Sequence, residues 1–539
     1  MSLLTTLLRG GYLRAVDHAL AQSLLRLRPE TPDDVLAAIA LASRAVAEGH
    51  SRLPLAQVSE FLVDLLPDRD VPALPALSEW LDLLRASPWI EEGQVVLLEG
   101  GALSLRRYWL HETRLATALL ARLGQDDRLQ LLTGGPGTGK TTRAAQLIVE
   151  LSARSPQPLR IALAAPTGKA AGRLGEVVNA RLAEMEVEGV PGAASARSQP
   201  IEARTLHRLI GWHSGGDIAH HAAAPLAYDV VVVDEASMVD LPMMARLLDA
   251  VAPEACLILI GDRDQLPSVD TGDVLAALCD AADRNPRLDA RRTHLTTVHR
   301  QDDTSEVGVL AGLIRGGDGE TVVARLRGSG FAGVRWWEAR DELLAAFCLE
   351  LALPAYRAVQ SATTPEAALA LATHFRVLTA LREGPAGSQT LNARIAAALD
   401  PQRRGDGMFQ GRLVLVTENS PRHGLYNGDV GIAWPDEAGE ARVWFDGRDG
   451  LRAWLPSALP AHESAFALTV HKAQGSEFDQ VLLALPERGA RVLSRELIYT
   501  GLTRCRQEIV LWASEPALRQ AIARRAQRWS GLAERLAAE

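Results

Sequence analysis

Residues 134–142 read GGPGTGKTT, and this stretch decides the fold that we expect for the chain. It fits the pattern G-x-x-x-x-G-K-[ST], follows the apolar run LQLL and precedes the helix-forming run TTRAAQLIVELSA. A strand, a glycine loop and a helix N-terminus form a cradle whose backbone N–H groups hold phosphate oxygens. The sequence therefore predicts an ATP site, with these residues around the phosphates: Gly134, Gly135, Pro136, Gly137, Thr138, Gly139, Lys140, Thr141 and Thr142.

Lysine is nearly absent from the chain, since all but three of its 57 Lys+Arg residues are arginines. The three lysines stand in GGPGTGKTT, APTGKAAGRL and TVHKAQGSE, at Lys140, Lys169 and Lys472. These positions are candidates for sites at which a compact ammonium is needed and a planar guanidinium is not a substitute. Lys140 is predicted to reach the β- and γ-phosphates of ATP.

Carboxylates at the end of a second strand complete the predicted site. The apolar run DVVVVDE at 229–235 ends in Asp234 and Glu235. Thr141 and Asp234 are expected to hold Mg²⁺, and Glu235 to orient and deprotonate the attacking water. Gln265, after the next strand, is expected to sense the γ-phosphate.

The chain divides into regions that differ in residue composition and hydrophobic pattern. From about residue 128, short β-rich runs alternate with helical segments, which is typical of an α/β fold with parallel sheets. Between about 405 and 465 the runs GRLVLVTENS, DVGIAWPD and ARVWFDG predict a small inserted β-barrel. Leu- and Ala-rich segments before about 105 predict a helical domain, and residues 180–200 predict a surface loop.

Composition and charge exclude several classes of protein. A net charge of −9 and a pI near 5.9 argue against a chain that coats nucleic acid, but they allow a local basic groove. The four cysteines are far apart and form no CxxC, which predicts reduced thiols in a cytoplasmic protein and no zinc site. Neither a signal peptide nor a membrane-spanning apolar run is predicted.

A series of motifs gives the chain a family resemblance. In order from about 130 to 506 they read GGPGTGKTT, APTGKAAGRL, TLHRLIG, VVVDEASMVDLPMM, GDRDQLPSVDTGDVL, VHRQ, RVLTALREGPAGSQTLN, GLYNGDVGI, TVHKAQGSEFD and ELIYTGLTRCR. With them the chain resembles superfamily 1 DNA helicases, and most closely the RecD-type alpha subunits of exodeoxyribonuclease V. The resemblance implies two RecA-like P-loop NTPase domains with parallel sheets, a helical N-terminal domain and a small inserted SH3-like β-barrel. The expected boundaries are 1–110 for the N-terminal partner-docking domain, 111–290 for the first RecA-like domain, 291–404 with 466–539 for the second, and 405–465 for the barrel.

The resemblance also implies roles for residues outside the phosphate loop. Arg300 in VHRQ and Arg504 in LTRCR would reach the γ-phosphate from the second domain and stabilise charge that develops in the transition state. Other residues would line a path for single-stranded DNA and contact mainly its phosphates and sugars. They are Pro166, Thr167, Lys169, Thr205 and His207 on the first domain, and Asn427, Thr469, His471 and Lys472 on the second.

The function implied by the resemblance is that of an ATP-dependent 5′→3′ single-stranded DNA translocase and helicase that acts on duplex DNA ends. Its partners would be RecB-like and RecC-like subunits in a heterotrimeric helicase–nuclease for recombination repair. No nuclease constellation is visible in this chain, so nuclease activity is expected in a partner subunit. No convincing glutamine precedes the phosphate loop, which leaves adenine selectivity open.

Two alternatives stay open at this point. One is a stand-alone helicase of the same family, which an N-terminal extension with helix-hairpin-helix repeats would favour. The other is an ATP-gated regulatory DNA-binding subunit with little hydrolysis, which an altered Walker lysine, acid or arginine would favour.

Overall fold

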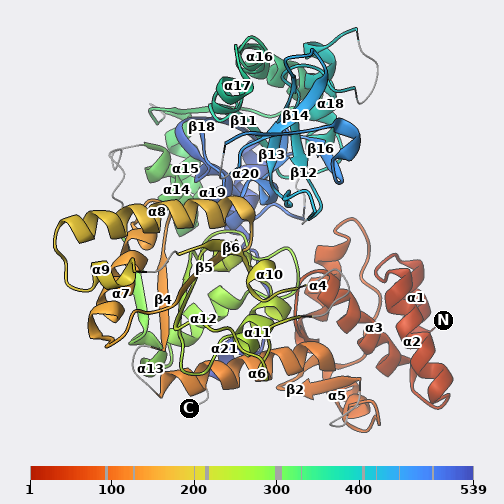
Figure 1. Ribbon diagram of the computed structural model, residues 1–539. Coiled ribbons are helices and arrows are strands. Elements are labelled where there is room, and N and C mark those ends of the chain that lie inside the picture. Colours follow the sequence, from red (N-terminus) through yellow and green to blue (C-terminus); the bar gives the residue numbers. More distant parts are fainter. Residues whose placement is uncertain are drawn as a thin grey trace.

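The computed structural model describes residues 2–537, apart from 91–94, 125–127, 199–200, 213–217, 298–305, 329–330, 403–406, 421, 448–449 and 488–490. Figure 1 shows the second α/β domain and its insert above the first, with the N-terminal domain beside the first domain. The chain returns at its C-terminal end to the base of the first domain (Figure 1). No helix in the described part of the chain is long and apolar enough to cross a membrane.

The first α/β domain is built on a six-stranded sheet in which every pair of neighbouring strands is parallel. Its central strands, Val230–Val233 and Cys256–Gly261, are buried along their whole length, as expected for a parallel sheet covered by helices on either side. In spatial order they are β6 (Ala203–Thr205), β5 (Ile161–Ala165), β7 (Val230–Val233), β8 (Cys256–Gly261), β4 (Leu129–Gly134) and β9 (Arg292–Leu295).

Helices cover both faces of this sheet. One apolar core includes α7 (Lys140–Arg154), α8 (Gly168–Val187) and α9 (Ala193–Ala196). The core on the other face includes α6 (Arg106–Leu123), α10 (Leu206–Leu209), the 3-10 turn η2 (Ala236–Met238), α11 (Leu241–Ala250), α12 (Val274–Ala282) and α13 (Pro286–Asp289).

The second α/β domain has a five-stranded sheet, also parallel throughout. Its strands, in spatial order, are β10 (Val334–Trp337), β19 (Cys505–Trp512), β18 (Phe478–Ala484), β11 (Phe375–Thr379) and β17 (Ala467–Thr469). Its helices are α14 (Glu306–Gly316), α15 (Gly319–Arg327), α16 (Asp341–Gln360), α17 (Pro365–Leu371), α18 (Ser388–Leu399), α19 (Arg495–Leu502) and α20 (Glu515–Ala523), and the 3-10 turn η4 (His471–Ala473) follows β17. The expected pair of parallel-sheet α/β domains is confirmed.

The insert is a five-stranded antiparallel sheet with a small apolar core of its own. In spatial order its strands are β15 (Arg452–Trp454), β14 (Ala441–Phe445), β13 (Val430–Pro435), β12 (Leu413–Val416) and β16 (His462–Ser464), and the 3-10 turn η3 is Pro456–Ala458. The predicted SH3-like barrel is not confirmed, because the strand pairing among the described residues ends at β15 and β16 and does not join them.

The N-terminal domain is mainly helical, as predicted. Residues 35–42 are buried without interruption, so α3 is apolar on all sides and forms the centre of the domain. Sequence reasoning missed a three-stranded antiparallel sheet of β1 (Leu53–Pro54), β3 (Ala102–Leu105) and β2 (Val96–Glu99). The helices are α1 (Leu3–Arg9), α2 (Ala15–Leu27), α3 (Asp33–Ala47), α4 (Val58–Leu65) and α5 (Leu77–Arg85), with the 3-10 turn η1 (Leu55–Gln57) before α4.

Two of the expected domain boundaries need correction. Strand β9 pairs with β4, so the first sheet extends to Leu295 and past the boundary expected at 290. Helix α21 (Leu532–Ala537), expected in the second domain, packs with Leu532 and Leu536 in the core beneath α6 and α12 of the first. Long-range contacts decide both placements, strand pairing for β9 and apolar burial for α21, and the local sequence pattern does not contain them.

The segment that leads to α21 also holds the N-terminal domain in place. Glu112 of α6 is buried and accepts hydrogen bonds from Ser51 Oγ and Ser530 Oγ, both at 2.6 Å. The ring of His50 stacks on Trp529 with centroids 4.2 Å apart. A buried carboxylate with several donors thus joins three distant parts of the chain.

The expected surface loop at 180–200 is partly wrong. Helix α8 continues to Val187, and the short helix α9 follows at Ala193–Ala196. The run ARLAEMEV consists mostly of residues with high helix propensity, which explains the longer helix. The helix ends just before Gly189, whose φ of 72° lies in the left-handed region.

Candidate nucleotide site and strand-binding cleft

The phosphate loop connects β4 to α7 as the sequence predicts, and its shape depends on glycine. Gly139 immediately precedes α7 with φ 79°, in the left-handed region that glycine adopts at little cost. A Cβ on Gly134 would lie 2.4 Å from the carbonyl oxygen of Leu295 and 2.8 Å from Thr138 Oγ1. The loop therefore packs against the end of β9 too closely for any side chain at this position.

Lys140 is the first residue of α7, and its ammonium folds back over the loop. Its Nζ donates to the carbonyl oxygens of Gly134 and Gly135, each at 2.7 Å. A phosphate oxygen is a charged acceptor and makes a stronger hydrogen bond to an ammonium than a neutral carbonyl does. Thr141 follows in the first helical turn, where unpaired N–H groups and the helix dipole favour an anion.

Asp234 and Glu235 follow β7 directly, and the backbone there is strained. Glu235 has φ 52° and ψ 42°, and it alone among the described non-glycine residues has a positive φ. A left-handed conformation costs about 1–3 kcal/mol in a non-glycine residue, and such residues cluster at functional sites. Asp234 Oδ1 accepts a hydrogen bond from the N–H of Glu235 at 2.8 Å, which fixes the turn.

Burial and neighbouring charge shape the acid–base properties of this site. Burial raises the pKa of Asp234, the charge of Glu235 raises it further, and Lys140 opposes the change. Burial also raises the pKa of Asp262, which follows β8, and Lys140 again opposes it. Buried carboxylates that repel one another favour a bound cation, and oxygen ligands of this kind are those that Mg²⁺ prefers.

Gln265 lies beside these acids with one polar atom unsatisfied. Its Nε2 donates to Asp262 Oδ2 at 3.4 Å, and the residue is 5% exposed. Its Oε1 is buried and has no hydrogen-bond partner among the described residues. An orphaned buried acceptor of this kind is rare, and it fits a site that is completed by a ligand or its water.

The second domain contacts this site through α19, a contact that sequence reasoning missed. The hydroxyl of Tyr499 donates to Asp262 Oδ2 at 2.9 Å, and a Cβ on Gly135 would lie 3.1 Å from that hydroxyl. Next to it, the N–H of Leu266 donates to Thr500 Oγ1 at 2.9 Å. The signal in the sequence is that Tyr499 and Thr500 both belong to the motif ELIYTGLTRCR, which also contains Arg504.

The structure describes only one of the two arginines that were predicted to reach the γ-phosphate. Arg504 is 3% exposed and donates from Nε to the carbonyl oxygen of Thr500 at 3.2 Å and from Nη1 to that of Ser476 at 3.3 Å. It is therefore held within the second domain, just after α19, and its action on phosphate stays a prediction. Arg300 lies outside the described residues.

We expect Tyr499→Phe to lower kcat for ATP hydrolysis about tenfold while nucleotide affinity changes little. The substitution removes one hydrogen bond between the domains, and a hydrogen bond to a charged group contributes about 1.5–3 kcal/mol. Steady-state hydrolysis at saturating single-stranded DNA measures it. Tyr356→Phe is the matched control, because Tyr356 donates to the carbonyl oxygen of Phe466 at 2.6 Å inside the second-domain core. An equal loss of kcat in both variants would mean that domain stability, and not the contact with Asp262, is responsible.

Predicted strand-binding residues of the first domain lie where α8 meets the second domain. Thr167 caps α8 by accepting a hydrogen bond from the N–H of Ala170 at 3.2 Å, with the half-buried Pro166 just before it. Lys169 Nζ donates to Ser476 Oγ of the second domain at 3.1 Å. Partial burial and nearby arginines lower the pKa of Lys169, although the residue keeps solvent-exposed surface.

Their predicted counterparts on the second domain follow β17. Lys472 forms a 2.6 Å ion pair with Glu463, and its N–H donates to Thr469 Oγ1 at 3.3 Å. Burial lowers the pKa of His471, so its imidazole is neutral at neutral pH. Asn427 is exposed on the loop before β13. Thr469, His471 and Lys472 therefore lie in one segment at the end of β17, whereas Asn427 lies on the insert.

The remaining first-domain residues lie on α10, which also faces the insert. Thr205 caps this helix by accepting a hydrogen bond from the N–H of Arg208 at 3.4 Å. The ring of His207 lies 5.1 Å from that of Trp212. The guanidinium of Arg208 lies 5.4 Å from the ring centroid of Tyr426 on the insert. Arg208, Trp212 and Tyr426 were not predicted, although basic and aromatic residues together are typical of single-strand sites.

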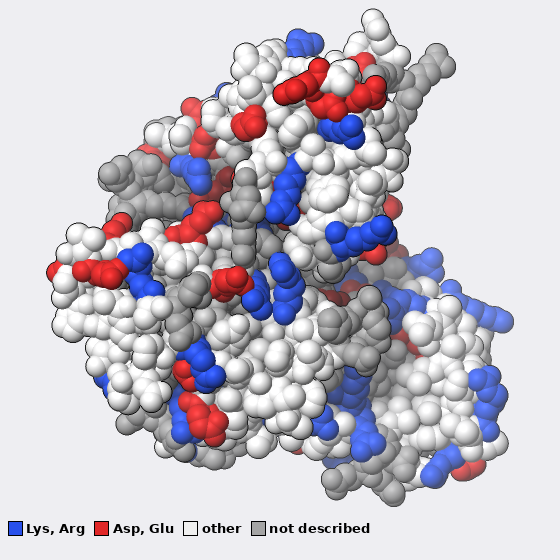
Figure 2. Space-filling view, viewed as in Figure 1, with Lys and Arg blue, Asp and Glu red and all other residues white. Residues whose placement is uncertain are grey.

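Basic side chains gather at two places on the face shown in Figure 2. One group lies along the boundary between the two α/β domains, and the other lies where the N-terminal domain meets the first α/β domain. The net charge of −9 is therefore distributed unevenly. The first group is consistent with a local groove for a polyanion.

Together the loop, the acids after neighbouring strands and the contact from a second α/β domain define the class. The chain is a P-loop nucleoside triphosphatase of the superfamily 1 helicase type. Family models agree, with an AAA domain at residues 115–334, a UvrD-like helicase C-terminal domain at 464–512 and the N-terminal domain of RecBCD enzyme subunit RecD at 9–99. The chain belongs to the RecD family of RecBCD enzyme subunits.

Individual relatives support this assignment. The chain is 37% identical to RecBCD enzyme subunit RecD of Mycobacterium tuberculosis, over 98% of this chain and 96% of that protein. It is also 37% identical to the subunit of the same name from Mycolicibacterium smegmatis, over 97% of each. It is 34% identical to the ATP-dependent RecD2 DNA helicase of Deinococcus radiodurans, over 76% of this chain but only 50% of that protein.

Proposed function

We propose that the chain is an ATP-dependent 5′→3′ single-stranded DNA translocase and helicase, and a subunit of a heteromeric helicase–nuclease. The observation that carries the proposal is the contact of Tyr499 with Asp262 beside the phosphate loop. Through this contact, a movement of the second domain would change the surroundings of a nucleotide bound to the first domain. The residues predicted to bind the strand include Lys169, which contacts Ser476 of the second domain, so opening and closing of the two domains would act on both sites.

In this mechanism each residue of the site has a defined task. Lys140 and the loop N–H groups bind the β- and γ-phosphates, and Glu235 accepts a proton from the attacking water. Thr141 and Asp234 would hold Mg²⁺, which when bound neutralises phosphate charge. Arg504 adds positive charge from the second domain, and that contribution depends on domain closure.

A short segment after β17 would link the nucleotide site to the residues predicted to bind the strand. Gln474 Nε2 donates to the carbonyl oxygen of Leu266, next to the nucleotide site, at 3.4 Å. Two residues further on, Ser476 accepts from Arg504 with its carbonyl and from Lys169 with its hydroxyl. One segment therefore contacts both the nucleotide site and the cleft. We infer that it converts closure into a change of grip on the strand.

We further propose that the N-terminal domain docks onto a RecB-like or RecC-like sister subunit. The leucines of SLLTTLLRGGYL and LVDLLPD look exposed from the sequence, but Leu4, Leu7, Leu62 and Leu65 are buried and cannot contact a partner. Other apolar side chains of this domain are exposed by 37–72%, namely Val16, Leu27, Val63, Leu77 and Leu83. The match of residues 9–99 to the RecD N-terminal domain favours a subunit over the stand-alone alternative, and these exposed side chains are the candidates for the contact with the partner.

Polarity is tested with tailed duplexes. We expect the protein to unwind a duplex with a 5′ single-stranded tail and to leave one with a 3′ tail intact. Strand separation is followed by fluorescence dequenching with ATP, and a non-hydrolysable ATP analogue provides the control. Unwinding from the 3′ tail at the same rate would overturn the proposed direction, and hydrolysis that DNA does not stimulate would favour the regulatory alternative.

A further inference from the structure

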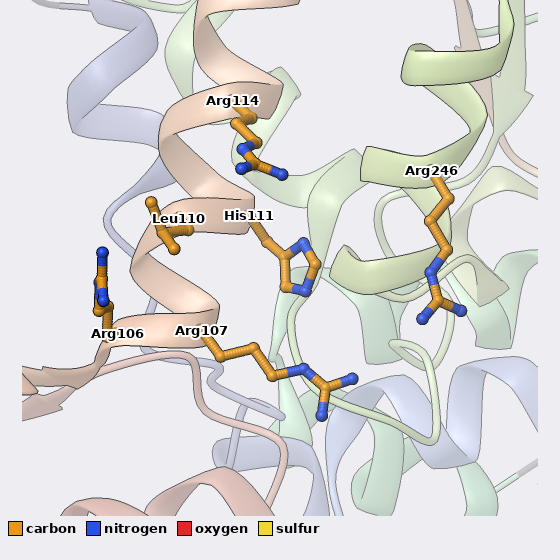
Figure 3. Close-up of a pocket in the computed structure, with 6 residues that line it drawn as sticks. All are labelled: Arg106, Arg107, Leu110, His111, Arg114 and Arg246. Atoms are coloured by element: carbon orange, nitrogen blue, oxygen red, sulfur yellow. The ribbon is translucent and has the colours of Figure 1, made fainter. Parts of the chain in front are cut away.

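A basic pocket outside the nucleotide site and the cleft opens between α6 and α11. Its volume is about 500 Å³. Figure 3 shows the side chains of Arg107, His111 and Arg114 extending from one helix toward the side on which Arg246 extends from the other. No residue of the pocket belongs to the predicted sites. It is lined by Arg106, Arg107, Leu110, His111, Arg114 and Arg246.

Three arginines of this pocket form no ion pair with a described residue, although two carboxylates act on them at longer range, Asp249 on Arg114 and Asp240 on Arg246. Within the described ranges, no carboxylate forms a salt bridge with Arg107, Arg114 or Arg246, and Arg107 and Arg114 are exposed. Burial lowers the pKa of His111, and the charges of Arg107, Arg246 and Arg114 lower it further. Three guanidiniums thus surround a neutral imidazole. Like charges held this close repel one another, and a bound polyanion relieves that repulsion.

The pocket is connected to the strand-binding cleft by a run of rings and cations. The guanidinium of Arg246 lies 4.0 Å from the ring centroid of Trp212. Trp212 is next to His207, whose pKa is lowered by burial and by the charge of Arg246. Beyond His207, Arg208 reaches Tyr426 of the insert. Cations therefore alternate with rings from the cleft to the pocket.

We propose that single-stranded DNA passing over α10 continues into this pocket, where Arg107, Arg114 and Arg246 bind its phosphates. Trp212 and His207 supply ring surface for its bases on the way. Arginine cations with stacking rings form the chemistry that binds single strands without regard to sequence. An acidic protein segment needs the cations but not the rings. The inference rests on the proposed function, because it extends the same DNA path.

The test compares binding of oligothymidylates of increasing length to full-length protein by fluorescence anisotropy. We expect R107Q/R114Q to leave the shortest bound strands unaffected and to weaken long strands on the order of tenfold at low salt. For long strands, the slope of log K against log salt should fall in magnitude by about 1.4, since each lost phosphate contact removes about 0.7. R107K/R114K keeps both charges and should restore the slope.

Two controls separate this effect from general loss of charge or folding. R85Q/R181Q removes the same charge from the exposed Arg85 and the partly exposed Arg181, which pair with Asp82 and Glu184, and it should bind like the wild type. A cooperative melt and DNA-stimulated ATP hydrolysis show that the variants are folded with an intact cleft.

Four outcomes decide the matter. Weakening confined to long strands supports the pocket as part of the DNA path. Unchanged binding at every length overturns it, and so does loss of partner subunits with normal DNA binding, which would make the pocket a protein interface. Failure of the wild type to bind any strand would instead refute the proposed function.

Discussion

Lys140→Gln is expected to reduce DNA-stimulated ATP hydrolysis by about 100-fold or more. The ammonium is held at the mouth of the loop by two carbonyls, and glutamine offers neither its charge nor its full reach. Loss of one preorganised charged donor at a reacting phosphate costs on the order of 10²–10³ in rate. Phosphate release in the presence of single-stranded DNA is the measurement. Unwinding should be lost to the same extent, because translocation depends on hydrolysis.

The control for this variant is Arg181→Gln, which removes a partly exposed positive charge on α8 that pairs with Glu184. We expect its hydrolysis to equal that of the wild type. Turnover by a folded Lys140→Gln protein at the wild-type rate would refute the assignment of the loop.

Glu235→Gln is expected to keep ATP binding and to lose hydrolysis by about 10²–10⁴-fold. Glutamine has the shape of glutamate but cannot accept the proton of the attacking water, and general base catalysis contributes a factor of this size. Affinity is measured with a fluorescent ATP analogue and hydrolysis by phosphate release. We also expect single-stranded DNA to dissociate more slowly from the variant than from the wild type in the presence of ATP, because the two domains cannot reopen without hydrolysis.

Glu254→Gln is the matched control, because Glu254 is exposed before β8 and away from the loop. If Glu235→Gln lost ATP affinity as strongly as hydrolysis, Glu235 would be needed for the shape of the binding site. Its assignment as the general base would then be wrong.

The nucleotide site could be predicted from the sequence because its parts are local. The loop between β4 and α7 and the acids after β7 each lie within a few residues of a recognisable strand, and parallel strands bring their carboxyl ends to one edge. The strain at Glu235 could not be predicted, because neither its type nor its neighbours require a positive φ.

The missed features depend on contacts between residues far apart in the chain. Tyr499 meets Asp262 across 237 positions, and the pocket forms only where α6 and α11 pack. Helix α21 shows a short apolar pattern that fits either domain, and the available space beneath α6 decides where it lies. Motif matching finds residues by type, and it does not show which of them touch.

The return of the chain to the first domain has a mechanical consequence. After β9 the polypeptide passes upward into the second α/β domain, and after α20 it passes back to α21. The upper domain is therefore attached to the lower one by two separate covalent connections. A body attached at two points turns most easily about the line that joins them. The motor stroke would then follow a single rotational axis set by chain topology, whatever nucleotide or strand is bound.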